Sequence, residues 1–308
     1  MRVLRGPYVD WEAVATPASV TVGVFDGVHR GHRFILERLN GPSLPTVVLT
    51  FEPHPAEVLA PGTNPRLITT IEERIELFEA AGIDVVAVVD LAEIRYLEPD
   101  EFVADVLLAK LGAKHVVVGA DFQFGRDRAG DCEFLIESGQ RNGFDVEVVE
   151  LIETEGVVSS TRIRRLIEQG DVAGAARLLG SRYRLTGEVA PGDHRGKDLG
   201  FPTANLKPPD RKVIPGNGIY AAWAHLRDQR VAAAVNIGTR PTFGGTELLI
   251  EAHLLDFDDD IYGVNLTLEF VERLRAEIEF ASVEDLVIAI TEDVSQVRRL
   301  LESSPVSG

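Results

Sequence analysis

The stretch Val20–His32, which reads VTVGVFDGVHRGH, decides how the first half of this chain folds. An apolar, β-branched run over residues 20–24 predicts a buried strand, and Phe25-Asp26-Gly27 predicts the turn that ends it. His29 and His32, spaced H-x-G-H, then stand at the start of a predicted helix, where backbone N–H groups attract phosphate. Two imidazoles at that place can donate hydrogen bonds to nucleotide oxygens as charge develops in a group transfer. The stretch therefore indicates nucleotide chemistry, and an ordinary strand, turn and helix with two surface histidines is the alternative.

The composition suits a globular protein of about two domains, with 308 residues, 45% of them hydrophobic and 26% charged. A formal net charge of −18 argues against a large nucleic-acid surface, so we expect no nucleic-acid partner. The single cysteine, Cys132, excludes an internal disulfide and a cysteine-cluster metal site, and it favours a reducing compartment. No apolar run has membrane-spanning length, so we expect a cytoplasmic location and no membrane partner. A homo-oligomer is compatible with the sequence.

Up to about Leu179 the chain alternates β-branched runs with helical patterns, which predicts a Rossmann-like α/β domain with a parallel sheet. Helices are predicted over residues 71–81, where Thr70 and Glu73 form a capping-box pattern, and over residues 99–111. Ligands of such sheets bind at the carboxyl ends of the strands, near the topological switch point. The predicted strands are Val20–Val24, Thr46–Thr50, Val85–Val89, His115–Val118 and Asp145–Val149.

After a boundary near Gly180, short β-like runs are separated by Gly, Pro and Asp turns, which predicts a small antiparallel barrel. The domains are therefore expected at residues 1–180 and 181–308. A last helix is predicted after Ser282, with Asp285 completing its capping box. The segment Asn236–Thr242 is interpreted as a polar turn. The predicted strands are Tyr183–Val189, Ile219–Ala224, Val231–Val235, Leu248–Leu254 and Asn265–Phe270.

Three further motifs of the first half follow predicted strands or open a helix. Aromatic rings in the glycine-flanked loop Gly119–Gly125 could stack on a planar ligand, or they could fill the core. Pro53-His54-Pro55 is a rigid turn that carries a histidine. Ser159–Arg164, which reads SSTRIR, offers hydroxyl, N–H and guanidinium groups to an anion, or plain N-capping by serine.

Two motifs stand out in the second half. In the string GKDLGFPTAN, Thr203 and Asn205 lie two apart in extended chain and point to one side, which suits Mg²⁺ bound by neutral oxygens, water and phosphate. Their alternative role is to hydrogen-bond the loop. Glu251 lies within the apolar run LLIEAHLLDF, on the face opposite to Ile250 and Ala252, and a carboxylate there can be a general base. An exposed strand face explains the same pattern without catalysis.

Taken in order, these strings resemble the bifunctional prokaryotic riboflavin kinase/FMN adenylyltransferase family, the FAD synthetases. GVFDGVHRGH, TFEPHP, GADFQFG and SSTRIR resemble its adenylyltransferase module. GKDLGFPTANL, GNGIYAAW, NIGTRPTFGG, IEAHLLDF and the terminal FVERLRAEIEFASVEDL resemble its kinase module, a six-stranded Greek-key barrel. Lys197 stands where an arginine is more usual, which keeps the charge and loses the bidentate fork.

The resemblance implies FMN formation from riboflavin and ATP, followed by adenylyl transfer from a second ATP, which gives FAD and pyrophosphate. Riboflavin, FMN and ATP are the implied small-molecule partners, with Mg²⁺ as cofactor. The implied catalytic residues are Glu251, His29 and His32. The implied nucleotide- or phosphate-binding residues are Gly23, Phe25, Gly31, Ser160, Thr161, Arg164, Gly196, Lys197 and Gly200. His54, Asp121, Phe122 and Phe124 are the implied flavin-binding residues, and Thr203 and Asn205 the metal ligands.

Three other readings keep part of this pattern. A nucleotidyltransferase with another acceptor needs H-x-G-H but not a second barrel with GFPTAN. A relative of class I aminoacyl-tRNA synthetases shares the H-x-G-H logic, and the acidic charge opposes it. A flavin-binding protein without activity would be favoured by loss of Glu251 or the histidines, and all three are present.

Overall fold

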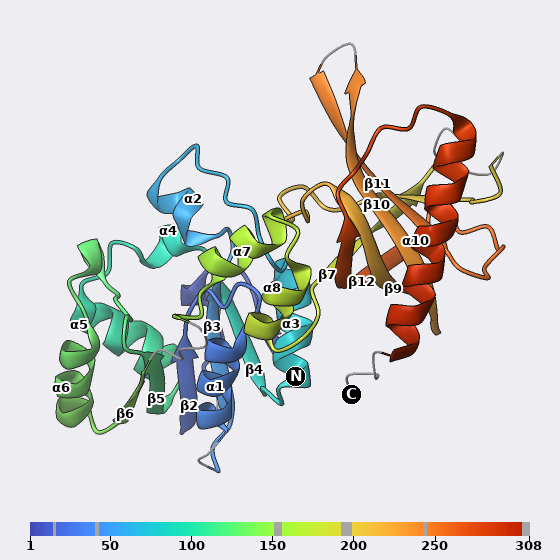
Figure 1. The fold of residues 1–308 in the computed structure, drawn as a ribbon. Coiled ribbons are helices and arrows are strands. Elements are labelled where there is room, and N and C mark those ends of the chain that lie inside the picture. The colour runs from blue at the N-terminus through green and yellow to red at the C-terminus, as the bar shows by residue number, and fades with distance from the viewer. Residues whose placement is uncertain (15–16, 41–42, 151–155, 192–198, 243–244, 304–308) are drawn as a thin grey trace. The chain divides into compact units, whose positions relative to one another are not determined.

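The computed structural model describes residues 1–308 apart from 15–16, 41–42, 151–155, 192–198, 243–244 and 304–308. The chain divides into two compact units, Met1–Ser160 and Thr161–Gly308 (Figure 1). The division falls about twenty residues before the predicted boundary near Gly180, so residues 161–180 group with the second unit.

A six-stranded parallel sheet forms the centre of the first unit, as predicted. The strand order is β1-β4-β3-β2-β5-β6. The chain moves outward from β2 through β3 to β4 and then crosses to β5 on the other side of β2, so the switch point lies between β2 and β5. The strands are β1 (Arg2–Leu4), β2 (Ala18–Val22), β3 (Thr46–Phe51), β4 (Val85–Val89), β5 (Ala113–Gly119) and β6 (Asp145–Val149). Only β1 is absent from the predicted set, since three residues are too short to show alternation.

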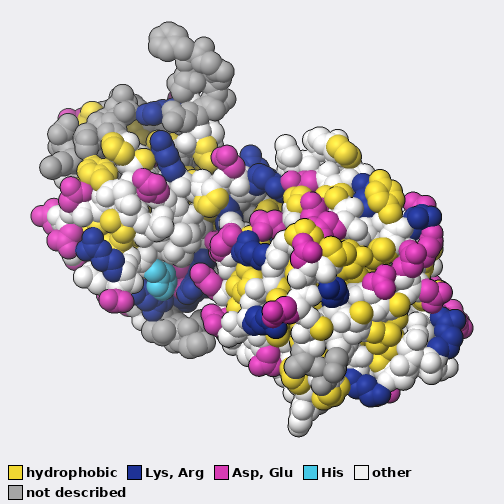
Figure 2. Space-filling view, turned by 180° about the vertical axis from the view of Figure 1, so that it is seen from behind, with side chains coloured by type: hydrophobic (Ala, Val, Ile, Leu, Met, Phe, Trp, Pro, Cys, Tyr) yellow, Lys and Arg dark blue, Asp and Glu magenta, His cyan; other side chains and the backbone are white. Residues whose placement is uncertain are grey.

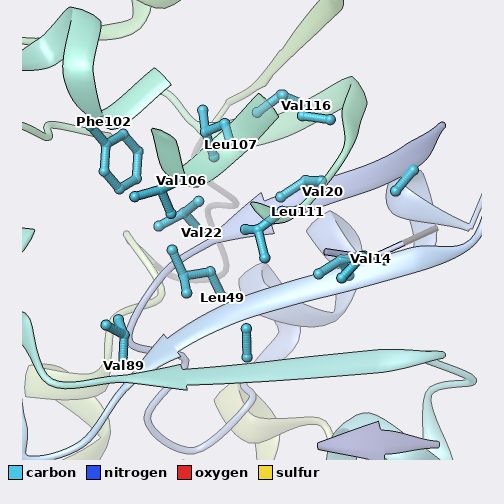
Figure 3. Close-up of a cluster of buried hydrophobic side chains, with 14 of the residues drawn as sticks. Val14, Val20, Val22, Leu49, Val89, Phe102, Val106, Leu107, Leu111 and Val116 are labelled. Carbon is cyan, nitrogen blue, oxygen red and sulfur yellow. The ribbon is translucent and has the colours of Figure 1, made fainter. Parts of the chain in front are cut away.

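Helices cover both faces of this sheet. Successive residues of its strands point to opposite faces, and the residues on both faces are buried. One face packs against the π-helical segment η2 (Phe102–Lys110), which continues α5 (Pro99–Glu101) as the predicted 99–111 helix. Figure 3 shows Phe102, Val106 and Leu107 of this segment above the strands of the sheet. The other face packs against α1 (Arg30–Leu39) and α3 (Ile71–Ala80), and α3 has the predicted Thr70–Glu73 capping box. The remaining elements are η1 (Tyr8–Asp10), α2 (Pro55–Leu59), α4 (Leu91–Ile94), η3 (Arg126–Arg128) and α6 (Cys132–Asn142).

The second unit is built on a closed six-stranded antiparallel barrel in the order β10-β11-β8-β7-β12-β9. Alternate residues fill the interior, among them Tyr220, Val235 and Ala252, which are fully buried. The strands are β7 (Arg184–Ala190), β8 (Ala204–Lys207), β9 (Gly218–Leu226), β10 (Gln229–Thr242), β11 (Gly245–Leu254) and β12 (Asn265–Arg275). The barrel and its closing helix are as predicted.

Helix α10 (Val283–Ser303) lies along the outside of the barrel, against β9 and β10 (Figure 1). Its C-terminal half buries Val297 and Leu301 against Ala221 and Leu255. The predicted cap is present, since Ser282 Oγ accepts from the Asp285 N–H at 3.1 Å. The helices α7 (Ser160–Glu168) and α8 (Val172–Leu179) precede the barrel.

Two parts of the barrel differ from the sequence prediction. The segment Asn236–Thr242 is not a turn but the second half of β10, which stays paired with β11 as far as Thr242 opposite Gly245. Gly238 and Pro241 interrupt its pattern, and long-range pairing overrides that local signal. The strand β8, which is not in the predicted set, begins at Ala204 and pairs there with β11.

Charges of both signs are mixed over the face shown in Figure 2, where acidic and basic side chains lie side by side on both units. The net charge of −18 is therefore not gathered into one acidic run on that face. None of the helices in the described ranges is long and apolar enough to cross a membrane.

Candidate active sites

The turn that ends β2 is fixed from beneath by Asp26, which is 1% exposed. Its carboxylate accepts hydrogen bonds from the N–H groups of Ile68 and Thr69, both at 3.0 Å, just before α3. The Thr69 hydroxyl accepts in turn from the Gly27 N–H at 2.9 Å. The segment 25–28 is therefore held in one conformation, at the switch point where ligands of parallel sheets bind.

The two histidines of H-x-G-H lie together at the N-terminus of α1. His29 is its N-cap, and Nδ1 of His29 accepts from the His32 N–H at 3.4 Å. The two rings stack, with centroids 3.5 Å apart. Because Nδ1 of His29 accepts, its proton lies on Nε2, which makes that nitrogen a donor. A Cβ at Gly31 would lie 3.3 Å from the His29 ring, which explains the glycine in the motif.

Both imidazoles are held neutral. Burial lowers the pKa of His29 to about 4, and the nearby Asp26 carboxylate offsets only part of this effect. Burial lowers the pKa of His32 well below its usual value, and the charges of His29 and Arg74 add to that effect. At neutral pH the pair is therefore a set of neutral hydrogen-bond donors rather than a pair of cations. Nδ1 of His32 is buried without a hydrogen-bond partner in the described part of the chain.

The buried Phe25 ring packs beneath this turn and contacts His32. The residue has a φ of 54° and is 2% exposed, and its ring packs edge-on against His32 with centroids 5.0 Å apart. A Cβ at Gly23 would lie 3.0 Å from the Phe25 ring, which is tighter than most side-chain contacts. Gly23 and Phe25 thus hold His32 in place from below.

Arg74 is a functional candidate that the sequence interpretation missed. It is 2% exposed, and its Nη1 donates to the Val24 carbonyl at 2.7 Å and to the Thr50 hydroxyl at 3.3 Å. It therefore joins the carboxyl ends of β2 and β3 beneath the histidines. A signal was present, because position 74 falls at helical spacing on the apolar face of Ile71 and Phe78.

The loop after β5 gives its two phenylalanines different positions. Phe124 is 7% exposed and packs against Phe102 and Phe134, so it fills the core. Phe122 is half-buried and stacks on Phe124 with centroids 5.3 Å apart. Asp121 is exposed at the carboxyl end of β5. Phe122 and Asp121 are therefore accessible to a ligand, whereas Phe124 is not.

The other first-half residues lie on helix starts. His54 caps α2, with Nδ1 accepting from the Ala56 N–H at 3.1 Å, so at least one of its nitrogens has a structural role. The Ser160 hydroxyl donates to the Asp26 carbonyl at 2.8 Å, which ties this last residue of the first unit to the turn after β2. Thr161 is exposed and Arg164 half-buried on the first turns of α7.

Glu251 lies on the outer wall of the barrel, as the predicted alternation requires. Its neighbours Ile250 and Ala252 are buried inside, at 2% and 0% exposure. Strand pairing places Asn205 of β8 directly opposite Glu251 of β11. An amide and a carboxylate predicted from distant parts of the sequence are therefore cross-strand neighbours.

The segment before β8 is tied to the same strand. Nδ1 of His253 is 2.8 Å from the Pro202 carbonyl, and the His253 ring contacts Phe201 edge-on. Thr203 lies between Pro202 and β8, so it is next to the part of β11 that carries His253, two residues from Asn205 along the chain. Gly200 has a φ of 84°, which suits glycine. The predicted phosphate-binding residues Gly196 and Lys197 lie outside the described residues.

Comparison with known proteins supports two modules in this order. The family model described as FAD synthetase matches residues 12–162, and the model described as riboflavin kinase matches residues 179–301. A bifunctional riboflavin kinase/FMN adenylyltransferase of Pseudomonas fluorescens is 40% identical over 293 residues, which are 92% of this chain and 93% of that protein. The chain belongs to the bifunctional riboflavin kinase/FMN adenylyltransferase family. Another member of the family, from Escherichia coli strain K12, is 36% identical over a region that covers 95% of this chain and 96% of that protein.

A solved structure agrees with this family fold over 97% of the chain. The crystal structure described as a macrolide-efflux protein from Streptococcus pneumoniae has a TM-score of 0.90 and 31% sequence identity. The superposed region covers 97% of this chain and 99% of the chain in that crystal structure. The fold is thus shared, whereas the efflux activity in that description is said of the other protein.

Proposed function

We propose that residues 1–180 transfer the adenylyl group of ATP to FMN and that residues 181–308 phosphorylate riboflavin. Family membership gives the overall chemistry: the enzyme makes FMN from riboflavin and ATP, and then FAD from FMN and a second ATP. The two family models, one on each part of the chain, support this division of labour. The single cysteine supports a reducing, cytoplasmic setting.

In the kinase step, Glu251 is the proposed general base. Its carboxylate takes the proton of the riboflavin 5′-hydroxyl, the 5′-oxygen attacks the γ-phosphorus of ATP, and ADP leaves. The strand register that places Glu251 opposite Asn205 is the observation that carries this assignment. It puts a carboxylate beside a residue of the segment expected to hold phosphates. Few reactive side chains are needed, because positioning and charge neutralisation supply most of the catalysis in phosphoryl transfer.

The donor set of this segment fits Mg²⁺. The hydroxyl of Thr203 and the amide oxygen of Asn205 are neutral oxygen ligands, which this cation accepts together with water and substrate phosphates. The described residues hold no cluster of three His, Cys, Asp or Glu side chains that could bind a metal by itself. When bound, the ion would neutralise charge on the ATP phosphates.

In the adenylyl transfer, a phosphate oxygen of FMN attacks the α-phosphorus of ATP and pyrophosphate leaves. His29 and His32 are proposed to donate hydrogen bonds to the phosphate oxygens as charge builds up, and their neutral state supports this role. Ser160, Thr161 and Arg164 are proposed to bind the leaving phosphates, and Asp121 with Phe122 the flavin. Phe124 is proposed to support the Phe122 ring from the core. No covalent enzyme intermediate is required.

A reciprocal pair of variants tests these assignments. Glu251→Ala is expected to abolish FMN formation from riboflavin and to leave FAD formation from supplied FMN intact. His32→Ala is expected to do the reverse. Both activities are measured by chromatographic separation of the flavins. In each variant, the activity that is kept shows that the unsubstituted unit is folded. Loss of both activities in either variant, with the fold intact by circular dichroism, would contradict the assignment of one site to each unit.

A further inference from the structure

Asn236 lies beside Glu251 on the outer face of the barrel, and the mechanism proposed above does not use it. β10 pairs with β11 so that Asn236 is directly opposite Glu251, and β8 pairs with β11 so that Asn205 is opposite Glu251 on its other side. Residues directly opposite on antiparallel strands have Cβ atoms about 5 Å apart. Glu251 is therefore flanked by two amide side chains, of which only Asn205 has a proposed role.

The side-chain oxygen of Asn236 is buried and has no hydrogen-bond partner among the described residues. The next position on this face of β10 is Gly238, where a Cβ would overlap the Glu277 carboxylate. An ionised carboxylate only accepts hydrogen bonds, so Glu277 cannot supply the missing donor to an amide oxygen. Native proteins pair nearly all such buried groups, with protein, water or ligand, because leaving them unpaired is unfavourable. The side-chain oxygen of Asn236 is thus a hydrogen-bond acceptor without a donor among the described residues, and it belongs to the residue opposite the proposed base.

We propose that Asn236 binds a secondary hydroxyl of the riboflavin ribityl chain. This inference rests on the proposed role of Glu251 at the terminal 5′-hydroxyl. The ribityl chain carries three further hydroxyls next to that terminal one, and each can donate to an amide oxygen. With the 5′-hydroxyl at Glu251, the cross-strand separation brings the 3′- and 4′-hydroxyls within reach of Asn236. Asn236 is therefore a substrate-binding residue that aligns the chain, so that the 5′-oxygen is presented to the phosphate.

The test measures kcat and KM of the kinase reaction in the full-length protein for riboflavin, 3′-deoxyriboflavin and 4′-deoxyriboflavin. The variants are Asn236→Ala and the milder Asn236→Ser. Asn265→Ala is the matched control, because Asn265 is an exposed asparagine on β12 of the same barrel. For riboflavin, Asn236→Ala is expected to raise KM about 3- to 10-fold, the equivalent of one lost neutral hydrogen bond, with little change in kcat. Asn265→Ala is expected to change neither constant.

The analogues separate substrate binding from a structural role. For one of the two deoxy substrates, the unchanged protein and Asn236→Ala are expected to have the same KM, because the hydroxyl that Asn236 binds is already missing. An equal rise in KM for riboflavin and both analogues would overturn the proposal and leave Asn236 a structural residue. Misfolded protein lowers the apparent kcat for all substrates alike and leaves these KM comparisons unaffected.

Failure of the underlying assignment has a different signature. Glu251→Gln is expected to lower kcat for riboflavin and both analogues. If Glu251→Gln kept full kcat, the proposed base would be wrong, whatever the analogues showed for Asn236. If Glu251→Gln lost kcat and Asn236→Ala left every KM unchanged, only the inference about Asn236 would fail.

Discussion

Replacing the buried Arg74 with methionine tests whether the adenylyl-transfer site depends on a cation beneath its histidines. The change keeps much of the side-chain volume and removes the charge. It also removes the hydrogen bonds from Nη1 to the Val24 carbonyl at 2.7 Å and to the Thr50 hydroxyl at 3.3 Å. The Val24 carbonyl keeps one donor, because the Thr50 hydroxyl lies 3.1 Å away.

The expected loss of stability follows from these contacts. A hydrogen bond from a charged donor contributes about 1.5–3 kcal/mol, and the second contact is long, so we expect the free energy of unfolding of the first unit to fall by about 2–3 kcal/mol. The Asp26 carboxylate, which loses a nearby positive charge, keeps its hydrogen bonds from Ile68 and Thr69. The variant is therefore expected to fold.

The catalytic consequence is a change in pH dependence. The charge of Arg74 helps to lower the pKa of His32, so its removal raises that pKa toward the ordinary value of 6.5. His32 then gains its proton at a higher pH as the solution is acidified, and the neutral donor is lost earlier. The acid limb of FAD formation from FMN is expected to move to higher pH in Arg74→Met and to stay in place in Arg74→Lys.

The assay is the initial rate of FAD formation between pH 5 and 8, with riboflavin phosphorylation by the same samples as the control. Urea unfolding followed by circular dichroism gives the stability. An unchanged acid limb in Arg74→Met, together with lower stability, would show that Arg74 supports the fold alone and would refute the electrostatic reasoning.

Three further predictions follow from the same geometry. Gly31→Ala places a Cβ 3.3 Å from the His29 ring and is expected to lower the rate of FAD formation by about tenfold or more, with the rate of FMN formation unchanged. A variant that forms FAD as fast as the unchanged protein would contradict this prediction. For His29, whose pKa falls from 6.5 unfolded to about 4 folded, stability is fully present above pH 6.5 and is lost as the pH falls toward 4, by up to about 3 kcal/mol. A urea titration series should show this slope and His29→Gln should reduce it, whereas the same slope in both proteins would exclude His29 as its source. Asn205→Ala is expected to raise the Mg²⁺ concentration needed for half-maximal FMN formation, with FAD formation unaffected; an unchanged Mg²⁺ dependence would remove Asn205 from the ion's ligands.

Local sequence was sufficient for much of the fold. Val85–Val89 matches β4, because a continuous apolar run in a parallel sheet leaves little ambiguity about where a strand begins. Asp145–Val149 matches β6, where valines alternate with acidic residues. The capping box at Thr70 likewise fixed the start of α3. These signals depend on residues within one or two turns of each other.

Features set by long-range pairing could not be predicted in this way. The strand β8 has four residues and follows a proline, so nothing local distinguishes it from a loop until β11 pairs with it. The placement of Asn236 beside Glu251 depends on the register of two strands, and a shift by one residue would move the amide to the interior. Arg74 became informative only when its burial and its two acceptors were known.

The candidate site was predicted unevenly for the same reason. The spacing of His29 and His32 already placed both imidazoles at one helix start, and the structure has them stacked there. Sequence could not decide whether the two phenylalanines of the β5 loop face a ligand or the core. Packing divides them, with Phe124 inside and Phe122 half-buried.

The central claim is that one chain carries two successive flavin reactions at separate sites. The most direct measurement incubates the purified protein with riboflavin, ATP and Mg²⁺ and separates the flavins by chromatography over time. Our account predicts that FMN appears first and FAD follows from it. Absence of product from riboflavin and from supplied FMN alike would contradict the account and favour a flavin-binding protein without activity.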